Sequence, residues 1–290
     1  LGKLESKDSP DLWIKEKLNE ASKKVNSYFE EYRFDLVTQT IYDFIWNEFC
    51  DWYIEICKIR LSSSEYKASE KRAILKSLIY TLEESLRLAH PIMPFITEEL
   101  WQQFKSMHKN KSLSIMISEY PNGKTKRASK AYKDMEWVKE IISGIRNIRG
   151  EMRIKPSVKI SALLQQGDNN DRRRSNDFEY LISELSGLKS LEWYSQKDET
   201  PASAINFHKK LKVLIPLEGL IEAEEEKKRI ERNVLKLTRE RESISKQLNN
   251  KKFISNAPKE LVSNQKKRFR EISQELNLQD IQIQEIQKLL

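Results

Sequence analysis

Positively charged side chains are the residues of this sequence whose types and spacing could carry a function, and the chemistry they offer is phosphate binding. Between Lys236 and Arg270 there are 11 lysines and arginines against three glutamates, a local charge of +8 that equals the formal net charge of the 290-residue chain. Such cations bind phosphate oxygens by charge-assisted hydrogen bonds. We therefore expect this segment to contact a polyanion, most simply a nucleic acid. The expected contact residues are Arg239, Lys246, Lys251, Lys252, Lys266, Lys267 and Arg270.

A second group of cations lies on a helix predicted from about Ser129 to Met152. Four of its basic residues follow each other at steps of seven, three and four, so they share one face beside the apolar seam of that helix. A basic stripe at the border of a helical core is suited to phosphates and unpaired bases. The alternative is a solvated face whose cations pair with acids of a neighbouring helix. The four residues are Lys139, Arg146, Arg149 and Arg153.

The first basic segment lies within a predicted antiparallel coiled-coil hairpin, residues 217–290. Apolar residues recur at alternating three- and four-residue spacing on both sides of a break at Asn249–Pro258. Two helices joined by so short a connection run antiparallel. Self-association is the usual alternative for a heptad repeat, but both arms are present in this chain. The expected seam is Ile230, Val234, Leu237, Ile244 and Leu248, then Val262, Phe269, Ile272, Leu276, Ile283, Ile286 and Leu290, with Arg241, Gln265 and Gln279 in the remaining slots.

The second group is placed by a predicted helical bundle, residues 1–155. Ser9-Pro10 opens its first helix, because a capping residue followed by proline suits a helix start. A strongly amphipathic helix is predicted from Arg33 to Arg60. Helical spacing assigns its aromatic residues to the core, with base stacking by one of them as the alternative. These aromatic residues are Trp46, Phe49, Trp52 and Tyr53.

Between bundle and hairpin, residues 156–216 predict a small mixed α/β module. Short apolar or alternating runs indicate strands, with one helix near Phe178–Leu185. Gln165–Asn176 is rich in polar residues and predicts a mobile loop. The fold class is therefore mainly α. The predicted strands are Val158–Leu164, Leu188–Trp193, Ala204–Phe207 and Leu211–Ile215.

No catalytic or metal-binding set is apparent. His90, His108 and His208 are scattered, and none has a second histidine or a cysteine at ligand spacing. There is no glycine-rich phosphate loop. Cys50 and Cys57 lie about 10 Å apart if they share a helix, too far for a disulfide. No apolar run approaches the roughly 18–20 residues that cross a bilayer, so we expect no membrane partner.

Four motifs in order carry a resemblance to class I aminoacyl-tRNA synthetases, closest to the valyl family. FIWNEFCDWYIE, residues 44–55, resembles the hallmark helix of the anticodon-binding domain, and HPIMPFITEELW, residues 90–101, resembles the helix break of the same domain. IRNIRGEM, residues 145–152, with Pro156 is similar to the segment that follows in the valyl family. LEGLI, residues 217–221, with Phe253 and Ala257-Pro258 resembles the C-terminal coiled coil of bacterial-type valyl enzymes.

This resemblance implies that the bundle holds the anticodon stem-loop of tRNA(Val) and that the hairpin touches the outer corner of the tRNA. Arg33 and Phe34 join the basic stripe as expected bundle contacts. The family's two adenylate-forming signatures and its editing domain are absent from this sequence. We therefore expect a C-terminal piece whose catalytic domain, with its ATP and magnesium, lies elsewhere in a parent chain.

The same resemblance implies that the chain by itself uses no cofactor. Two cysteines unable to form a disulfide predict a cytoplasmic protein, and a seam that both arms of one chain can fill predicts a monomer. A stand-alone RNA-binding module and a self-associating coiled-coil protein remain the alternative interpretations of the sequence.

Overall fold

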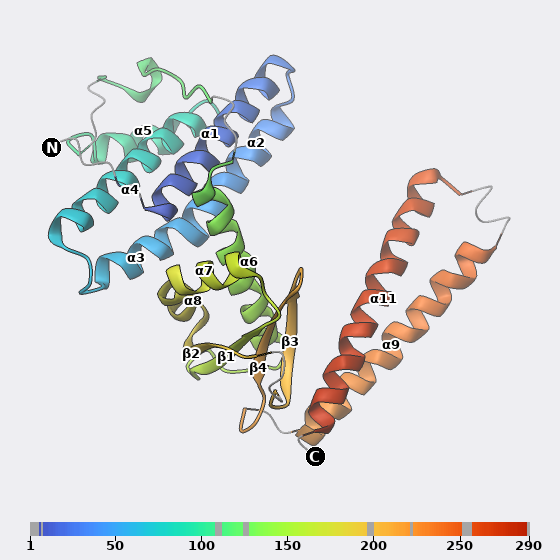
Figure 1. Ribbon diagram of the computed structural model, residues 1–290. Helices are drawn as coiled ribbons and strands as arrows, with labels where there is room; N and C mark the ends of the chain where they lie inside the picture. The colour runs from blue at the N-terminus through green and yellow to red at the C-terminus, as the bar shows by residue number, and fades with distance from the viewer. Residues whose placement is uncertain are drawn as a thin grey trace. The chain divides into compact units, whose positions relative to one another are not determined.

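The computed structural model describes residues 6, 8–107, 112–123, 128–195, 200–220, 223–250 and 257–288. It divides into two compact units, Leu1–Lys139 and Glu140–Leu290. Helices dominate both, and a four-stranded mixed sheet lies in the second (Figure 1). The predicted mainly α fold with a small α/β module is confirmed. The predicted borders after residues 155 and 216 stay predictions. No helix of the described ranges is long and apolar enough to cross a membrane.

The first unit is a bundle whose long helices bury their apolar stripes against one another. Pro10 stands in the first turn of α1, as the sequence predicts. Trp13, Ile14 and Val25 of that helix are fully buried. The elements are α1 (Ser9–Glu30), α2 (Phe34–Tyr42), η1 (Asp43–Ile54), α3 (Glu55–Ser62), α4 (Ala68–Ala89), α5 (Pro94–Gln103) and η2 (Ile115–Ile117).

The predicted helix over Arg33–Arg60 is interrupted by η1, a stretch of π-helix. Its buried residues are Phe44, Phe49 and Tyr53, at spacings of five and four instead of three and four. The wider turn rotates Trp46 out of the face that a 3.6-residue period assigns to it. Trp46 is 55% exposed, so its predicted place in the core is wrong. Phe49 and Tyr53 are buried as predicted.

A buried ionic cluster joins the start of α1 to the end of α3. The Arg60 guanidinium donates to both carboxylate oxygens of Asp11, at 3.1 and 2.7 Å, and Tyr53 donates its hydroxyl to the same carboxylate. Arg60 and Asp11 are 1% and 0% exposed. Burial, and the charge of Asp11, raise the pKa of Tyr53 above its ordinary value. The cluster therefore fixes two distant segments of the bundle to each other.

The second unit begins within α6 (Lys130–Glu151) and contains the predicted strands. The sheet order is β2-β1-β4-β3, with β1 and β2 parallel and the other pairs antiparallel. Every strand end lies within two residues of its predicted position. The start of β4 and both ends of β2 are the same as predicted. The elements are β1 (Ile160–Gln165), α7 (Asn169–Asp177), α8 (Glu179–Ser186), β2 (Leu188–Trp193), β3 (Ser203–His208) and β4 (Leu211–Pro216).

The loop predicted over Gln165–Asn176 is wrong for most of its length, because α7 occupies it. Asp168 caps α7, since its carboxylate accepts from the amides of Asn170 and Asp171 at 2.7 and 2.9 Å. The Asp171 carboxylate in turn accepts a hydrogen bond from the amide of Asp168 at 2.9 Å. This reciprocal capping box satisfies the otherwise unpaired amides of the first turn.

The predicted hairpin is confirmed as two antiparallel helices, α9 (Ala223–Asn249) and α11 (Lys259–Gln287) (Figure 1). Leu237, Ile244, Ile272 and Leu276 form a buried seam, and Val234, Leu248 and Phe269 pack against it. The side-chain oxygens of Gln265 and Gln279 are buried without a hydrogen-bond partner among the described residues. The seam therefore tolerates polar slots, as the sequence indicates. Lys251, Lys252 and Phe253 lie outside the described residues.

Candidate nucleic-acid interface

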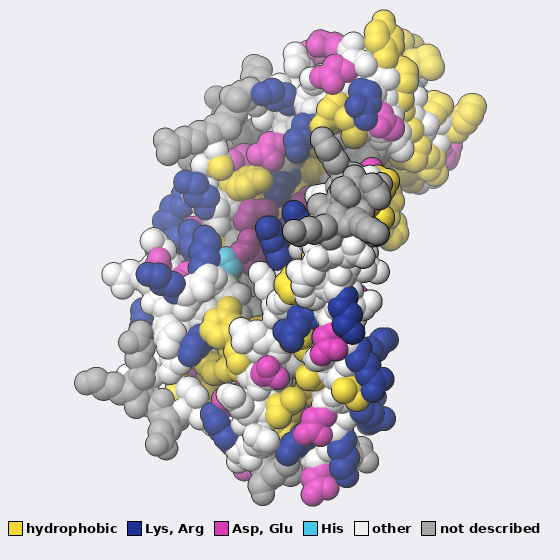
Figure 2. All heavy atoms as spheres, turned by 90° about the vertical axis from the view of Figure 1, so that its right-hand side faces the viewer, with side chains coloured by type: hydrophobic (Ala, Val, Ile, Leu, Met, Phe, Trp, Pro, Cys, Tyr) yellow, Lys and Arg dark blue, Asp and Glu magenta, His cyan; other side chains and the backbone are white. Residues whose placement is uncertain are grey.

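Five of the predicted contact cations of the hairpin lie outside its seam and face solvent. Arg239, Lys246, Lys266, Lys267 and Arg270 are all exposed. Figure 2, which looks onto the hairpin, shows lysine and arginine side chains gathered along one edge of the view. Because the heptad pattern assigns the apolar residues to the seam, the cations are left on the outer surfaces of α9 and α11. The structure thus places these five predicted contact residues where a phosphate could reach them.

Some basic residues of the hairpin are engaged with acids. Arg268 joins the two helices through Glu240, with nitrogen–oxygen distances of 2.9 and 3.3 Å. This contact raises the pKa of Arg268 and lowers that of Glu240. Lys267 lies 3.9 Å from Glu271. Within the described part of the hairpin, no acid pairs with Arg239, Lys246, Lys266 or Arg270.

The basic stripe on α6 is engaged much more fully. Lys139 forms ion pairs with Glu48 and Glu136, and its ammonium lies 5.0 and 5.4 Å from the ring centroids of Trp13 and Trp52. Its side chain is 15% exposed. This is the alternative that the sequence left open, a cation paired with acids of a neighbouring helix. Lys139 therefore has little surface left for a phosphate.

Lys17 completes the cluster around Lys139. It lies 3.3 Å from Glu48 and 3.1 Å from Glu136. Burial alone would lower the pKa of Lys17, but the two carboxylates raise it above its ordinary value. Burial likewise opposes ionisation of Glu136, yet the hydrogen bond from Trp13 and the charges of Lys139 and Lys17 lower its pKa. The cluster is charged and internally balanced, which is typical of a structural role.

Arg146 and Arg149 bind main-chain oxygens of the second unit. Arg146 donates twice to the carbonyl of Leu185, at 3.1 and 2.9 Å. Arg149 donates to the carbonyls of Lys155, Pro156 and Val158 at 2.8, 3.2 and 2.9 Å. Arg149 therefore holds the segment that leads from α6 into β1. Arg153 is exposed and has a left-handed backbone, with φ of 52°.

We expect Arg149→Gln to destabilise the second unit, because several carbonyl oxygens lose a charged donor. Each such bond contributes about 1.5–3 kcal/mol, so a loss of about 2 kcal/mol in the free energy of unfolding is expected. Denaturant unfolding measures it. Arg153→Gln, which changes the same charge on a residue outside the carbonyl cluster, serves as the control. Equal stability of the two variants would contradict the structural role of Arg149.

The turn between α1 and α2 presents the other two predicted bundle contacts. Phe34 is 52% exposed, and Tyr32 beside it is 79% exposed with a left-handed backbone. Their ring centroids are 6.4 Å apart in an edge-on arrangement. Arg33 pairs with Asp35 through two bonds of 3.0 and 2.7 Å, which lower the pKa of Asp35 to about 2. The turn therefore offers open aromatic rings beside a cation already shared with an acid.

A second aromatic platform contains Trp46, for which the sequence left base stacking open as the alternative, and Tyr42, which the sequence did not single out. Tyr42 and Trp46 are each 55% exposed, and their rings are stacked at 6.2 Å with an interplanar angle of 10°. A flat exposed indole is a surface on which an unpaired base can stack. Exposure of Trp46 follows from the π-helix η1, and the hydrophobic pattern of the sequence does not predict a π-helix.

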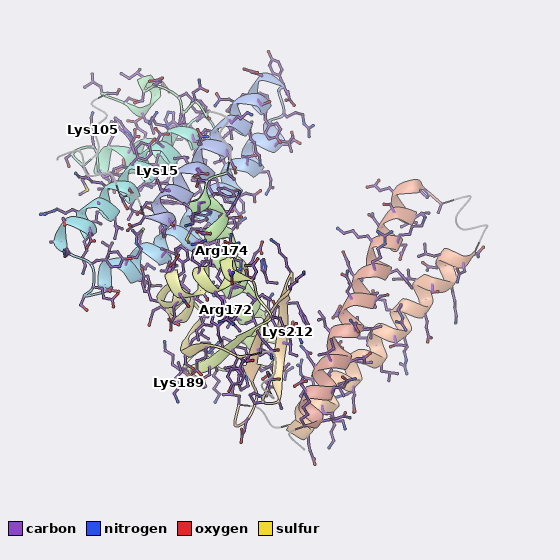
Figure 3. All side chains as sticks on the ribbon, viewed as in Figure 1. Lys15, Lys105, Arg172, Arg174, Lys189 and Lys212 are labelled. Carbon is purple, nitrogen blue, oxygen red and sulfur yellow. The ribbon has the colours of Figure 1, made fainter. Side chains whose placement is uncertain are left out.

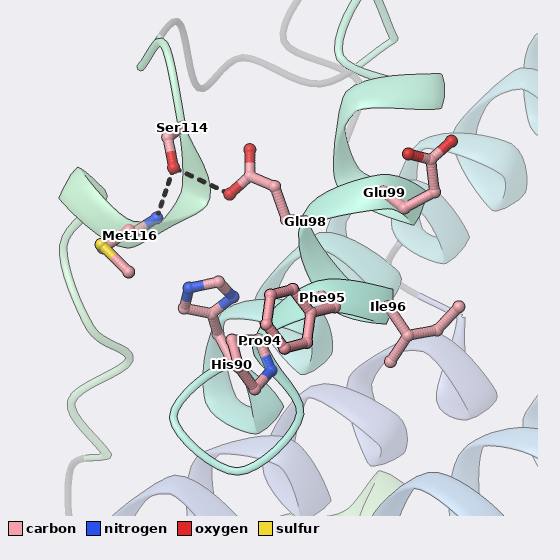
Figure 4. A pocket seen from close by; sticks show the side chains of 8 residues that line it. All are labelled: His90, Pro94, Phe95, Ile96, Glu98, Glu99, Ser114 and Met116. Carbon is pink, nitrogen blue, oxygen red and sulfur yellow. Dashed lines mark hydrogen bonds between the residues drawn. The ribbon is translucent and has the colours of Figure 1, made fainter.

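A hollow of about 740 Å³ lies at the helix break before α5 (Figure 4). Apolar side chains such as Phe95, Ile96 and Met116 line it together with Glu98 and Glu99. Glu98 accepts a hydrogen bond of 2.8 Å from the Ser114 hydroxyl. Its lining contains acids and no lysine or arginine, so it is unsuited to a phosphate. Elsewhere in the described ranges, no group of histidine, cysteine, aspartate and glutamate residues could hold a metal ion.

Two models of known protein families match the bundle and the hairpin. A model described as the anticodon-binding domain of tRNA ligase matches residues 11–164, more than half of the chain. The chain belongs to this family. A second model, described as the valyl tRNA synthetase tRNA binding arm, matches residues 222–287, the helical hairpin. The bundle of the first unit is thus the core of the anticodon-binding domain, and the predicted family resemblance is confirmed.

Individual relatives agree with both models. A valine–tRNA ligase of Psychrobacter arcticus is 35% identical over 282 residues, which are 97% of this chain and 29% of that protein. One from Xylella fastidiosa strain M23 is 36% identical over 270 residues, 92% of this chain and 27% of that protein. One from Francisella tularensis is 37% identical over 254 residues, 87% of this chain and 27% of that protein. The chain thus spans less than a third of the length of these relatives.

Proposed function

We propose that this chain is the tRNA-binding part of a valine–tRNA ligase. Its anticodon-binding domain would hold the anticodon stem-loop of tRNA(Val), and its hairpin would contact the outer corner of the same tRNA. The observation that carries the proposal is the hairpin, where exposed unpaired cations coincide with the segment that matches a tRNA-binding arm. Aminoacylation belongs to a catalytic domain that the relatives' greater length can accommodate.

The hairpin also argues against a protein built for self-association. Its buried seam is filled from within the chain, since Leu237 and Ile244 of α9 pack with Ile272 and Leu276 of α11. A monomer in the cytoplasm, without a cofactor of its own, is part of the same proposal. In a full ligase, binding energy from these remote contacts would help position the acceptor end of the tRNA for catalysis.

Titration with transcribed tRNA(Val) at several salt concentrations tests the proposal. We expect saturable binding whose affinity falls steeply with salt, because each neutralised phosphate releases counterions. Four or more contacts would give a slope of about −3 or steeper in log affinity against log salt concentration. Fluorescence anisotropy of labelled tRNA measures it. No binding at low salt, or a slope near zero, would contradict the proposed function.

A further inference from the structure

One end of the sheet in the second unit carries cations that neither family model covers. This end contains the exit of β1, the start of α7 and the turn between β3 and β4. Residues 165–221 lie between the matched segments 11–164 and 222–287. We propose that Arg172, Lys209, Lys210 and Lys212 form a further binding surface for the sugar-phosphate backbone of RNA. This inference rests on the proposed function for its ligand, tRNA.

Close packing holds α7 against the strand ends. A Cβ on Gly167 would come within 2.7 Å of the Trp193 ring and 2.8 Å of the Leu211 side chain, so the loop fits only without a side chain there. The Trp193 indole donates to the Ser175 hydroxyl at 2.8 Å. The capping box of Asp168 and Asp171 fixes the first turn of α7. This packing fixes the position of α7, and with it the position of Arg172.

Two of the cations lie over aromatic rings. The Arg172 guanidinium is 4.5 Å from the ring centroid of Trp193, and the Lys212 ammonium is 5.9 Å from that of Phe207. An arginine that stacks on an indole keeps the edge of its guanidinium open for bidentate hydrogen bonds to phosphate. Phe207 is 44% exposed, so its ring offers a stacking surface beside Lys212.

The register of the strands shows how the two cation–ring pairs are related. In the sheet, Trp193 of β2 lies opposite Leu164 of β1, and Lys212 of β4 lies opposite Gln165 of β1 and Phe207 of β3. Because Leu164 and Gln165 are neighbours on β1, the two pairs project to opposite faces of the sheet. Trp193 and Phe207 belong to the two outer strands, which are about 14 Å apart at ordinary strand spacing. The surface therefore wraps over the end of the sheet, where an RNA strand could cross it.

Four described acids at or near this end already have partners. Asp168 and Asp171 accept main-chain amides, Asp177 pairs with Arg173 at 2.8 Å, and Glu140 pairs with His208 at 2.6 Å. Main-chain amides, and the charges of Arg174 and Lys209, lower the pKa of Asp168. Gly167, next to the cap of α7, packs against Leu211 at the start of β4. Among the described residues, no acid pairs with the four proposed cations. Their charge is left for an external anion.

The test compares Lys210→Glu with Lys189→Glu. Both lysines are exposed residues of the second unit, and neither is paired with a described acid. Lys189 stands at the start of β2, at the other end of the sheet from Arg172 and Lys212 (Figure 3). We expect Lys210→Glu to weaken tRNA binding about tenfold, at the lower end for a charge-assisted contact, and Lys189→Glu to change it little. In Lys210→Glu, but not in Lys189→Glu, the slope of log affinity against log salt concentration should become less steep by about 0.7–0.9 for each phosphate contact that is lost.

A second pair of variants separates charge from geometry at the tryptophan. Arg172→Lys keeps the charge but loses the planar fork, and Arg172→Gln loses both, so binding should weaken in that order. Thermal unfolding of each variant confirms that the fold is retained. Equal affinity and equal salt slope for Lys210→Glu, Lys189→Glu and the unchanged protein would overturn this inference while the proposed function stands. If the unchanged protein binds no tRNA, both fail.

Discussion

Replacing Arg60 by methionine is expected to lower the free energy of unfolding of the bundle by about 3–5 kcal/mol, because the change leaves a buried carboxylate without its cation. Asp11 is 0% exposed and accepts two bonds from Arg60, against one each from Tyr53 and Ser6. Methionine fills a similar volume, so the loss measures the charge rather than a cavity. Urea unfolding followed by circular dichroism gives the free energy of unfolding.

Two controls make this prediction specific. Arg33→Met removes a cation that also binds an aspartate through two bonds, but the Arg33 and Asp35 side chains are 53% and 64% exposed, so no measurable change is expected. Asp11→Asn with Arg60→Met removes both charges and should recover part of the loss, because a neutral buried pair costs less than an unpaired ion. If Arg60→Met by itself is as stable as the unchanged protein, the cluster does not hold α1 to α3.

The sequence predicts the helices and strands where the hydrophobic pattern is strong. The hairpin seam and all four strands follow from the hydrophobic pattern, because each hairpin helix buries one face and the inner strands β1 and β4 are apolar runs buried on both faces. α7 could not be found this way, since Asn169–Asp177 has no apolar stripe and depends on the capping box of Asp168 and Asp171. Trp46 was misplaced because a hydrophobic period presumes an α-helix and η1 is a π-helix. Both misses occur where local hydrogen bonding, rather than burial, decides the conformation.

The candidate contact residues divide in the same way. Exposure of the hairpin cations could be predicted, because a two-helix seam determines which positions face outward. The partners of Arg149 could not, because its acceptors are carbonyls of Lys155, Pro156 and Val158 whose placement depends on the chain after α6. Pairing of Lys139 with Glu48 was foreseen only as an alternative. The hairpin is therefore the stronger candidate surface, and contact of tRNA with any of the predicted residues, in the hairpin or in the bundle, stays a prediction.

Reversing the charge of four hairpin cations should lower affinity for intact tRNA by about a hundredfold or more, since each charge-assisted contact contributes about 1.5–3 kcal/mol. The variant carries glutamate in place of Arg239, Lys246, Lys266 and Arg270, which are exposed and pair with no described acid. None of them belongs to the buried seam, so the helices should remain paired. Affinity for an isolated anticodon stem-loop should change less than about twofold, because that ligand lacks the outer corner and charges beyond a Debye length are screened.

The matched control for the reversal lies on the same helix. Lys228→Glu makes the same change of charge as Lys246→Glu, but 18 residues, or about 27 Å, nearer the start of α9. Lys228 is 71% exposed and lies 4.0 Å from Glu224. If the arm binds tRNA through its outer part, Lys246→Glu weakens binding to intact tRNA and Lys228→Glu does not. Equal losses on tRNA and stem-loop would mean that the arm acts through folding of the chain, and no loss on either ligand would remove the hairpin from the interface.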